Sequence, residues 1–332
     1  MKKLTPILII LLITSCTPHQ MHTKINFSGM AQGTYYTITY FDHLDRNFQP
    51  QIDSLLDAFD MSVSIWEPAS IISRINRGEE GVSCDSTFIQ TYLKARTVAE
   101  ESNGAFDYTV GPLVNAWGFG FKDRQMVDQD LIDSLRHLID YKYVKLEGDR
   151  IVMEKKGIQF DFNAVAQGYS VDLLGEFLSS KGIMNYLIDV GGEILAEGEK
   201  PGKGAWVVGI EKPSEDELSE RRLETTLELR NRALATSGNY RKYYEENGVR
   251  YSHTIDPHTG YPVTHTLLSV SVLARDCGTA DAWATAFMVM GLKKGKEILK
   301  TNKDLDAYFI YSGTHGPLET YYTEGMKELL LK

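Results

Sequence analysis

The most informative segment of the chain is Gly278-Thr279-Ala280-Asp281-Ala282-Trp283-Ala284-Thr285-Ala286, which places a carboxylate and a hydroxyl four residues apart at the head of an apolar stretch. If the segment is helical, Asp281 and Thr285 lie on one face about one turn apart. Hard divalent cations such as Mg²⁺ prefer oxygen ligands and complete their shell with water and phosphate oxygens. A buried helix whose Asp and Thr bond only to its own backbone has the same pattern. The segment therefore predicts a helix, and leaves its chemistry open.

Outside this segment, stretches with strand composition outnumber helical ones. Apolar residues recur with a helical period over residues 51–62 and 86–102, and Asn163 is placed to cap a further helix that ends before Gly182. Strand composition occurs over residues 34–40, 186–190, 205–210, 223–229, 267–273 and 307–312, and residues 151–162 are predicted to form a hairpin or a pair of strands. Because the strands come in runs, we expect an α+β fold with mixed, mostly antiparallel sheets rather than a doubly wound parallel sheet.

The N-terminus has the features of a bacterial export signal. Met1-Lys2-Lys3 precedes an apolar run over residues 4–13, shorter than the roughly 20 residues that a membrane-spanning helix needs. Ile13-Thr14-Ser15-Cys16 resembles a lipobox, in which Cys16 is acylated; an ordinary cleaved signal with a chance cysteine is the alternative. We expect a signal peptide (1–15), a lipidated tether (16–26) and a single domain (27–332), anchored by lipid to the bacterial cell membrane and facing the periplasm or the cell exterior.

Composition and missing motifs exclude several classes of protein. The formal net charge of −10, without a basic cluster, argues against a nucleic-acid partner. No Gly-x-Gly-x-x-Gly leads from a strand into a helix and no Walker A lysine motif occurs, so neither a Rossmann nor a P-loop nucleotide site is expected. Cys84 and Cys277 would be the only thiols of the mature domain, and a disulfide between them stays open.

Several glycine-containing segments suit close approach of the backbone to a ligand. Taken singly, each has an ordinary explanation: Gly191-Gly192 marks a tight turn, and Asp256-Pro257-His258-Thr259-Gly260 suits a β-turn. The segments cover residues 104–113, 115–120, 161–169, 189–193, 235–240 and 253–262.

In this order, the segments resemble the ApbE family, the FAD:protein FMN transferases. Gly33-Thr34 resembles the end of a Met-Gly-Thr motif, and Trp66-Glu67-Pro68 with Ser73-Arg74-Ile75-Asn76 resembles a Tyr-x-Pro…Ser-Arg-Phe-Asn stretch. Residues 107–120 match Asp-x-Thr-x-Gly-Pro-Leu-x-x-x-Trp-Gly-Phe-Gly nearly throughout, residues 161–172 are similar to Asp-x-Gly-x-x-Ala-Lys-Gly-Tyr-x-x-Asp, and residues 253–263 to His-x-Ile-Asp-Pro-x-Thr-Gly-x-Pro-Val. The resemblance covers almost everything after the lipobox. The chain departs from the family at Gln32, Asn163 and Gln167, where Met, Gly or Ser, and Lys are usual.

The resemblance implies two intertwined lobes with FAD in the cleft between them. It also implies Mg²⁺-dependent transfer of FMN from FAD to a threonine hydroxyl of a partner protein through a phosphoester bond, with release of AMP. Mg²⁺ would be held by the side chains of Asp281 and Thr285 and the backbone carbonyl of Ala164, with the carbonyl of Ala284 as a further option. FAD contacts would fall at Gln32, Trp66, Ala105, Phe106, Asp107, Asp161, Gln167 and Ile255, with the Trp66 indole as the stacking surface for the flavin.

The threonine hydroxyl is a poor nucleophile and needs a base. His253 is the candidate, because imidazole titrates near neutral pH and can accept the hydroxyl proton. Two alternatives stay open: a Mg²⁺-dependent FAD pyrophosphatase that yields FMN and AMP, and a non-catalytic flavin-binding lipoprotein. The family implies acceptors among membrane redox subunits, such as those of Na⁺-translocating NADH:quinone reductase (Nqr) or Rnf-type complexes.

Overall fold

The computed structural model describes residues 22–120, 127–214, 222–239, 243–246, 249–313 and 317–331. The predicted signal peptide and Cys16 lie outside the described residues, so the predictions made for them are not addressed by the fold.

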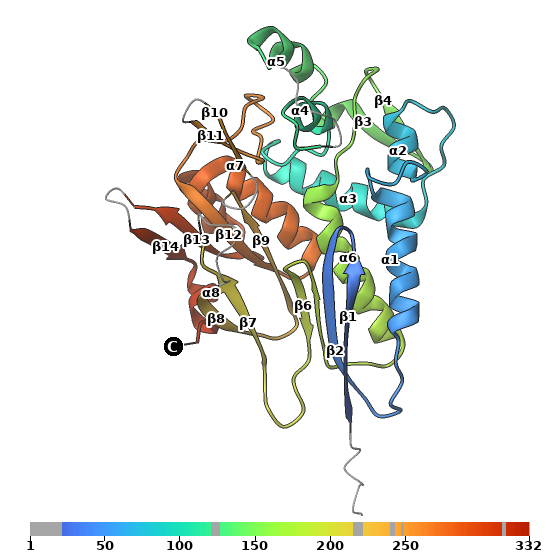
Figure 1. Cartoon of the computed structure of the whole chain (residues 1–332), viewed down its shortest axis with the longest axis vertical. Helices are drawn as coiled ribbons and strands as arrows, with labels where there is room; N and C mark the ends of the chain where they lie inside the picture. Colours follow the sequence, from blue (N-terminus) through green and yellow to red (C-terminus); the bar gives the residue numbers. More distant parts are fainter. Residues whose placement is uncertain are drawn as a thin grey trace, which may run out of the picture.

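An eight-stranded sheet runs through the described chain, and each neighbouring pair of its strands is antiparallel (Figure 1). Its order is β1 (Thr23–Ala31), β2 (Thr34–Asp42), β5 (Tyr186–Val190), β6 (Glu193–Glu197), β9 (Arg232–Gly238), β12 (Leu267–Ala274), β13 (Asp306–Ser312) and β14 (Leu318–Tyr322). Two-stranded antiparallel ribbons pair β3 (Val144–Glu147) with β4 (Arg150–Met153), β7 (Trp206–Glu211) with β8 (Leu223–Leu229), and β10 (Tyr243–Glu246) with β11 (Val249–Ser252). The predicted α+β class with antiparallel sheets is confirmed.

The long helices pack on one face of this sheet (Figure 1). They are α1 (Gln49–Val63), α3 (Ser86–Glu101), α6 (Asn163–Ser180) and α7 (Cys277–Thr301). Tyr36, Ile38 and Ile188 from β2 and β5 are buried in the same cluster as apolar residues of α1 and α6, while residues of β9 and β12 are buried with those of α3 and α7. The ribbon β7–β8 and α8 (Glu324–Leu329) share a separate apolar cluster with β6 and β13. The remaining short helices are α2 (Ile71–Asn76), α4 (Gly111–Ala116), α5 (Gln129–Arg136) and the 3₁₀ turn Tyr141–Tyr143.

The apolar segment over residues 278–286 forms the start of α7, as predicted. Asp276 caps this helix, because its carboxylate accepts the backbone N–H of Thr279 at 3.0 Å. Trp283 is buried beneath the helix, only 1% exposed. The helix is interrupted at Gly291, whose φ of +74° is a left-handed conformation that glycine adopts without strain.

Most predicted elements have close counterparts: residues 51–62 and 86–102 lie in α1 and α3, and β5 and β8 have the predicted bounds. Two local predictions were wrong. Residues 154–162 are not strand, since β4 ends at Met153. Asn163 does not cap α6; the helix begins after Phe162, and the carboxylate of Asp161 accepts the Asn163 N–H at 2.8 Å. In addition, β1 begins at Thr23, inside the stretch predicted as tether.

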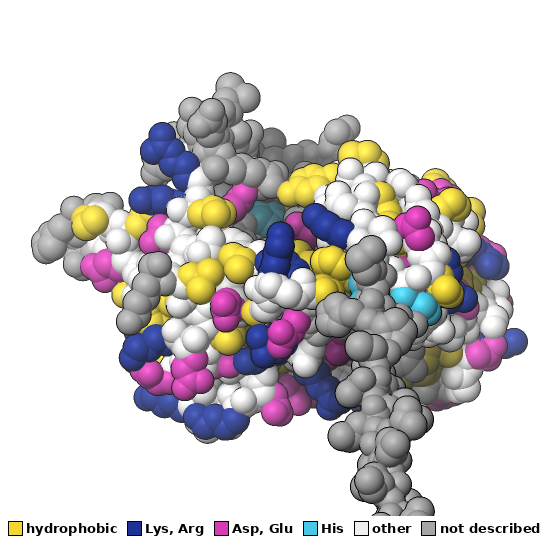
Figure 2. All heavy atoms as spheres, turned by 90° about the horizontal axis from the view of Figure 1, so that it is seen from below, with side chains coloured by type: hydrophobic (Ala, Val, Ile, Leu, Met, Phe, Trp, Pro, Cys, Tyr) yellow, Lys and Arg dark blue, Asp and Glu magenta, His cyan; other side chains and the backbone are white. Residues whose placement is uncertain are grey.

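On the surface, acidic and basic side chains are interspersed over the face seen in Figure 2. None of the helices in the described part of the chain is both long and apolar enough to span a bilayer.

Candidate functional site

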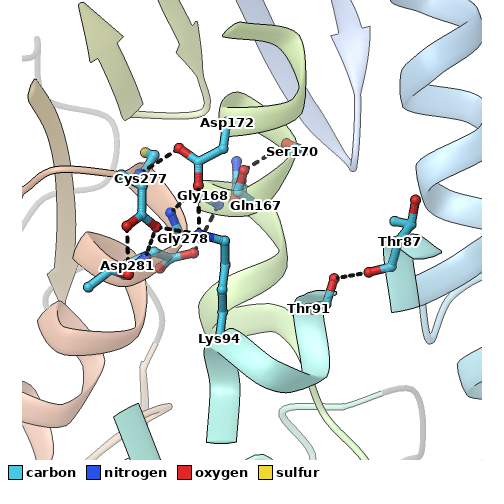
Figure 3. A network of polar contacts seen from close by, with 12 residues as sticks. Thr87, Thr91, Lys94, Gln167, Gly168, Ser170, Asp172, Cys277, Gly278 and Asp281 are labelled. Atoms are coloured by element: carbon cyan, nitrogen blue, oxygen red, sulfur yellow. Dashed lines mark hydrogen bonds and ion pairs between the residues drawn. The ribbon is translucent and has the colours of Figure 1, made fainter. Parts of the chain in front are cut away.

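The first turns of α6 and α7 touch at Gly168. Its backbone N–H donates a 3.1 Å hydrogen bond to Oδ2 of Asp281, and a Cβ added at Gly168 would press on the carbonyl of Cys277 and lie 2.8 Å from the Cβ of Asp281. Glycine is therefore required for the two helices to approach this closely. The contact brings the predicted carboxylate ligand to the start of the predicted FAD-binding helix (Figure 3).

The backbone at the start of α6 is distorted where the resemblance places a carbonyl ligand. Ala164 has φ −93° and ψ 20°, outside the helical range, although it lies inside the helix. In an unbroken α-helix the N–H of Gly168 bonds to the carbonyl of Ala164, four residues earlier. Here that N–H donates to Asp281 at 3.1 Å. A carbonyl oxygen has two lone pairs, so the Ala164 carbonyl at this distorted turn is suited to ligate a cation.

Thr285 lies one turn beyond Asp281 on α7. Its hydroxyl is 3.0 Å from the hydroxyl of Ser237 on β9, and either oxygen can be the donor. When Thr285 donates, the lone pairs of its oxygen are left for a cation. Ala284 is fully buried within α7, well before the break at Gly291.

A third element, the turn between β5 and β6, reaches the same place. Gly191 and Gly192 form a two-residue hairpin turn with φ of +64° and +111°. The side-chain amide of Gln167 donates to the carbonyl of Val190 at 3.0 Å, which ties this turn to α6. Glu193 follows the turn and is 7% exposed, and its Oε2 has no hydrogen-bond partner. This buried acid was not predicted, because Gly191-Gly192 indicated only a turn.

Asp281 and Glu193, the two buried acids at this place, have strongly raised pKa values. Burial raises the pKa of Asp281 to about 7, although the bond from Gly168 favours the charged form. Burial also raises the pKa of Glu193 well above its usual range, and the nearby charge of Asp281 adds to this. Buried carboxylates with perturbed pKa values are common where proteins place charge for function. Within the described residues, no cluster of three or more His, Cys, Asp or Glu side chains forms a metal centre, so a cation here would rely on few carboxylates together with hydroxyl and carbonyl oxygens.

A separate acidic group holds the N-terminus of α7. Both carboxylate oxygens of Asp172 accept backbone N–H groups, from Cys277 at 2.7 Å and from Gly278 at 3.0 Å (Figure 3). Lys94 of α3 bridges this carboxylate at 3.6 Å and that of Asp276 at 2.6 Å. Burial and then the charge of Asp276 raise the pKa of Asp172 to about 7, against the effect of Lys94. The network thus fixes α7, and with it Asp281, relative to α3 and α6.

Gln32 also contacts α6, through Ser170. It occupies the β1–β2 turn with φ +54°, and its Oε1 accepts the hydroxyl of Ser170 at 3.3 Å while its Nε2 is buried without a partner. The structure therefore gathers Gln32, Ala164, Gln167, Asp281 and Thr285 around the start of α6.

Asp107 and Asp161 are buried acids that brace adjacent loops. Asp107 accepts the N–H and hydroxyl of Thr109 through Oδ1 and the N–H of Tyr141 through Oδ2, and burial raises its pKa to about 6. Burial likewise raises the pKa of Asp161, whose Oδ1 accepts the N–H of Asn163 at 2.8 Å. Part of the acceptor capacity of both acids is therefore used inside the protein. The neighbouring Ala105 and Phe106 are buried in the apolar core.

The other predicted residues lie on connections. Trp66, between α1 and α2, has 60% of its surface exposed. His253 follows β11 and meets the ring of Phe119 edge-on, at 6.4 Å between ring centroids. Ile255 is buried and forms an isolated antiparallel bridge with Pro262. The contacts of the α6–α7 crossing described above do not include these three residues.

A cavity of about 590 Å³ opens beside the loop that holds Asp107. Its lining includes Gly104, Asp107, Arg136, Tyr141 and His258. It shares Asp107 with the predicted FAD contacts but none of the residues at the α6–α7 crossing.

Cys84 and Cys277 are both buried free thiols. Burial raises the pKa of Cys84 to about 11 and that of Cys277 well above its usual range, so both are inert hydrophobic side chains here.

The chain is similar to known flavin transferases over nearly its full length. Residues 32–309 match the model of the ApbE family. A Vibrio cholerae protein named FAD:protein FMN transferase is 35% identical over 303 residues, 89% of each chain. The solved structure of the flavin transferase ApbE from Vibrio cholerae superposes with a TM-score of 0.83 at 32% identity, covering 93% of this chain and 100% of that one. The apo form of the Pseudomonas stutzeri flavinyl transferase ApbE gives the same TM-score at 31% identity, covering 93% and 97%. Because the family model spans most of the sequence and these relatives match in sequence and fold, the chain belongs to the ApbE family.

Proposed function

We propose that this protein transfers FMN from FAD to a threonine hydroxyl of a partner protein and releases AMP. The observation that carries the proposal is the α6–α7 crossing, where a buried carboxylate, a hydroxyl and a distorted backbone carbonyl gather in a chain whose relatives are named FAD:protein FMN transferases. The threonine oxygen forms a bond to the phosphorus of the FMN half, the bridging pyrophosphate bond breaks, and its electron pair leaves with AMP.

The residues at the crossing fit a magnesium ion. Asp281, Thr285 and the carbonyl of Ala164 offer hard oxygen ligands, and Asp281 is buried, so a cation would offset the cost of holding its negative charge out of water. The carbonyl of Ala284 remains a further option. When bound, Mg²⁺ would polarise the transferred phosphoryl group and neutralise charge on the leaving AMP.

FAD would lie along the loops that meet at the start of α6. Its contacts would be Gln32, Trp66, Ala105, Phe106, Asp107, Asp161, Gln167 and Ile255, and the exposed indole of Trp66 is suited to stack on the flavin ring. Gln167 stands where the family usually has Lys, and its amide is engaged with the carbonyl of Val190. We infer that this position supports the β5–β6 turn in this protein and adds no charge for the pyrophosphate.

His253 would act as the general base. Its imidazole takes the proton from the threonine hydroxyl as the oxygen attacks phosphorus, a contribution typically worth about 10²–10⁴-fold in rate. Its position near Phe119, on the connection after β11, leaves it on a segment separate from the cation ligands. The base and the cation ligands would therefore come from different segments of the chain.

Membrane attachment completes the proposal. Acylation of Cys16 would hold the enzyme on the bacterial membrane, facing the periplasm or cell exterior, and raise its effective concentration near acceptors in membrane redox subunits of the Nqr or Rnf kind. Labelling with a radioactive fatty acid, compared between the native chain and a Cys16→Ala variant, tests this part by itself.

Incubation of the protein with FAD, Mg²⁺ and a threonine-bearing acceptor, followed by mass spectrometry, tests the transfer. We expect the acceptor to gain the mass of FMN less water, with one AMP formed per acceptor modified. Free AMP and FMN with an unmodified acceptor would show hydrolysis, and intact FAD would show binding alone; either result contradicts the proposal. An acceptor with that threonine changed to alanine is the matched control.

A further inference from the structure

Glu193 is a buried acid that has no ion-pair partner among the described residues. It is 7% exposed, Oε2 has no hydrogen-bond partner, and no ion pair among the described residues reaches it. A buried carboxylate oxygen without a hydrogen-bond partner destabilises the folded protein, because it loses its hydration and gains no replacement. An acid kept at such a position indicates that a bound group stabilises it.

The turn that carries Glu193 is tied to the helix crossing that holds Asp281. Gln167, which donates to the carbonyl of Val190 just before the turn, directly precedes Gly168, whose N–H donates to Asp281. The charge of Asp281 acts on the buried carboxyl of Glu193 and helps to raise its pKa.

Lys94, the basic side chain described at the start of α7, is paired with Asp172 and Asp276. Two buried acids beside one helix crossing, with no ion pair to a basic side chain among the described residues, form a place that attracts a cation.

The backbone holds Glu193 firmly in this position. Gly191 donates its N–H to the carbonyl of Tyr35 at 2.9 Å, and Gly192 donates to the carboxylate of Asp189 at 2.9 Å. Gln167 braces the same turn through Val190. Because α6, β2 and β5 each hold the turn, the carboxylate of Glu193 is preorganised rather than free to swing towards water.

We propose that Glu193 is a second acidic group of the cation site, with Oε2 accepting a hydrogen bond from a water ligand of the divalent cation held at Asp281. The inference rests on the proposed function, since it assigns a cation to the α6–α7 crossing. Mg²⁺ usually keeps several waters, which need acceptors of this kind, and loss of such a partner typically weakens metal binding about 10–100-fold. Glu193 is thus a positioning residue that sets the affinity for the ion.

The test measures the binding of Mn²⁺ to the metal-free full-length protein. The decrease of the electron paramagnetic resonance signal of free Mn²⁺ reports how much is bound. We expect Glu193→Gln to weaken binding about 10–100-fold. Glu197→Gln, at the other end of the same strand, is the matched control and should bind as the native protein does. Glu193→Asp, which keeps the charge on a shorter arm, should fall between the two.

Thermal unfolding without metal separates this role from a structural one. The Glu193→Gln variant should be at least as stable as the native protein, because a neutral amide replaces an unpaired buried acid of the same shape. Native-like Mn²⁺ affinity in Glu193→Gln, or weaker binding that accompanies a lower unfolding temperature of the metal-free variant, would overturn the inference. Failure of the native protein itself to bind Mn²⁺ would instead contradict the proposed function.

Discussion

The backbone N–H of Gly168 donates to the carboxylate of Asp281 across 113 residues of sequence. This bond joins α6, which has a glycine at the contact, to α7, which carries the buried acid there. The orientation of Asp281 therefore depends on the close approach of α6, and not on α7 alone.

Gly168→Ala should separate the two helices. The added Cβ would meet the carbonyl of Cys277 and the Cβ of Asp281, which are backbone and short side chain that cannot swing away. Overpacking of this kind costs about 1–3 kcal/mol, measured by urea unfolding. The variant should also bind Mn²⁺ more weakly. Glu176→Ala, on an exposed part of the same helix, is the control, and a Gly168→Ala protein with native stability and affinity would refute the crossing geometry.

Asp281→Asn should abolish Mg²⁺-dependent flavin transfer while the protein stays folded. The amide oxygen can still accept the Gly168 N–H, but it brings no charge to the cation. Isothermal titration with Mg²⁺ and acceptor flavinylation measure the two effects, and Asp304→Asn on an exposed loop is the control. Transfer by the native protein that persists in excess EDTA would count against the metal site.

His253→Ala should keep FAD binding and lose most of the transfer. Loss of a general base typically lowers the rate about 10²–10⁴-fold without changing ground-state affinity. Flavin fluorescence titration gives the affinity, and the initial rate of acceptor labelling gives the turnover. The exposed His137→Ala serves as control. If labelling by His253→Ala equals that of the native protein, another group is the base.

Asp42→Asn should destabilise the protein at neutral pH and less in acid. The Asp42 carboxylate, fully buried, bonds to the Nε of Arg46 at 2.8 Å, which holds the pKa of Asp42 well below its usual range. A group with a depressed folded pKa stabilises above its unfolded pKa and loses that contribution as pH falls. We expect a loss of about 1.5–3 kcal/mol at pH 7 and roughly 1 kcal/mol less at pH 3, by urea unfolding.

The exposed ion pair of Glu79 with Arg74 gives the control for this pH dependence. Glu79→Gln should leave the unfolding midpoint unchanged at both pH values, because water screens the pair. A constant difference between Asp42→Asn and the native protein from pH 7 to pH 3 would contradict the assignment.

Features that depend on residues close together in the sequence could be predicted, and features that depend on contacts between distant segments could not. The α7 helix and its Asp281 and Thr285 pair follow from spacing within nine residues, and the motif resemblance supplied the family. The capping prediction for Asn163 failed because the helix begins one residue earlier than predicted, so Asn163 is its first residue and its own N–H bonds to the carboxylate of Asp161. Glu193 could not be predicted as a buried acid, since its burial depends on α6 and α7 closing over a turn distant in sequence.

If the protein is anchored through Cys16 as proposed, the position of Thr23 would limit how far from a bilayer it can work. With Cys16 acylated, the chain from Cys16 to the first residue of β1 could extend at most about 25 Å at 3.3–3.6 Å per residue. The strand adds roughly 30 Å before the Gln32 turn at its far end. Flavinylation would therefore be confined to a layer about 55 Å deep above the lipid. Threonines displayed close to the membrane would be modified, and identical sequences held farther from it on tall, stalked domains would escape.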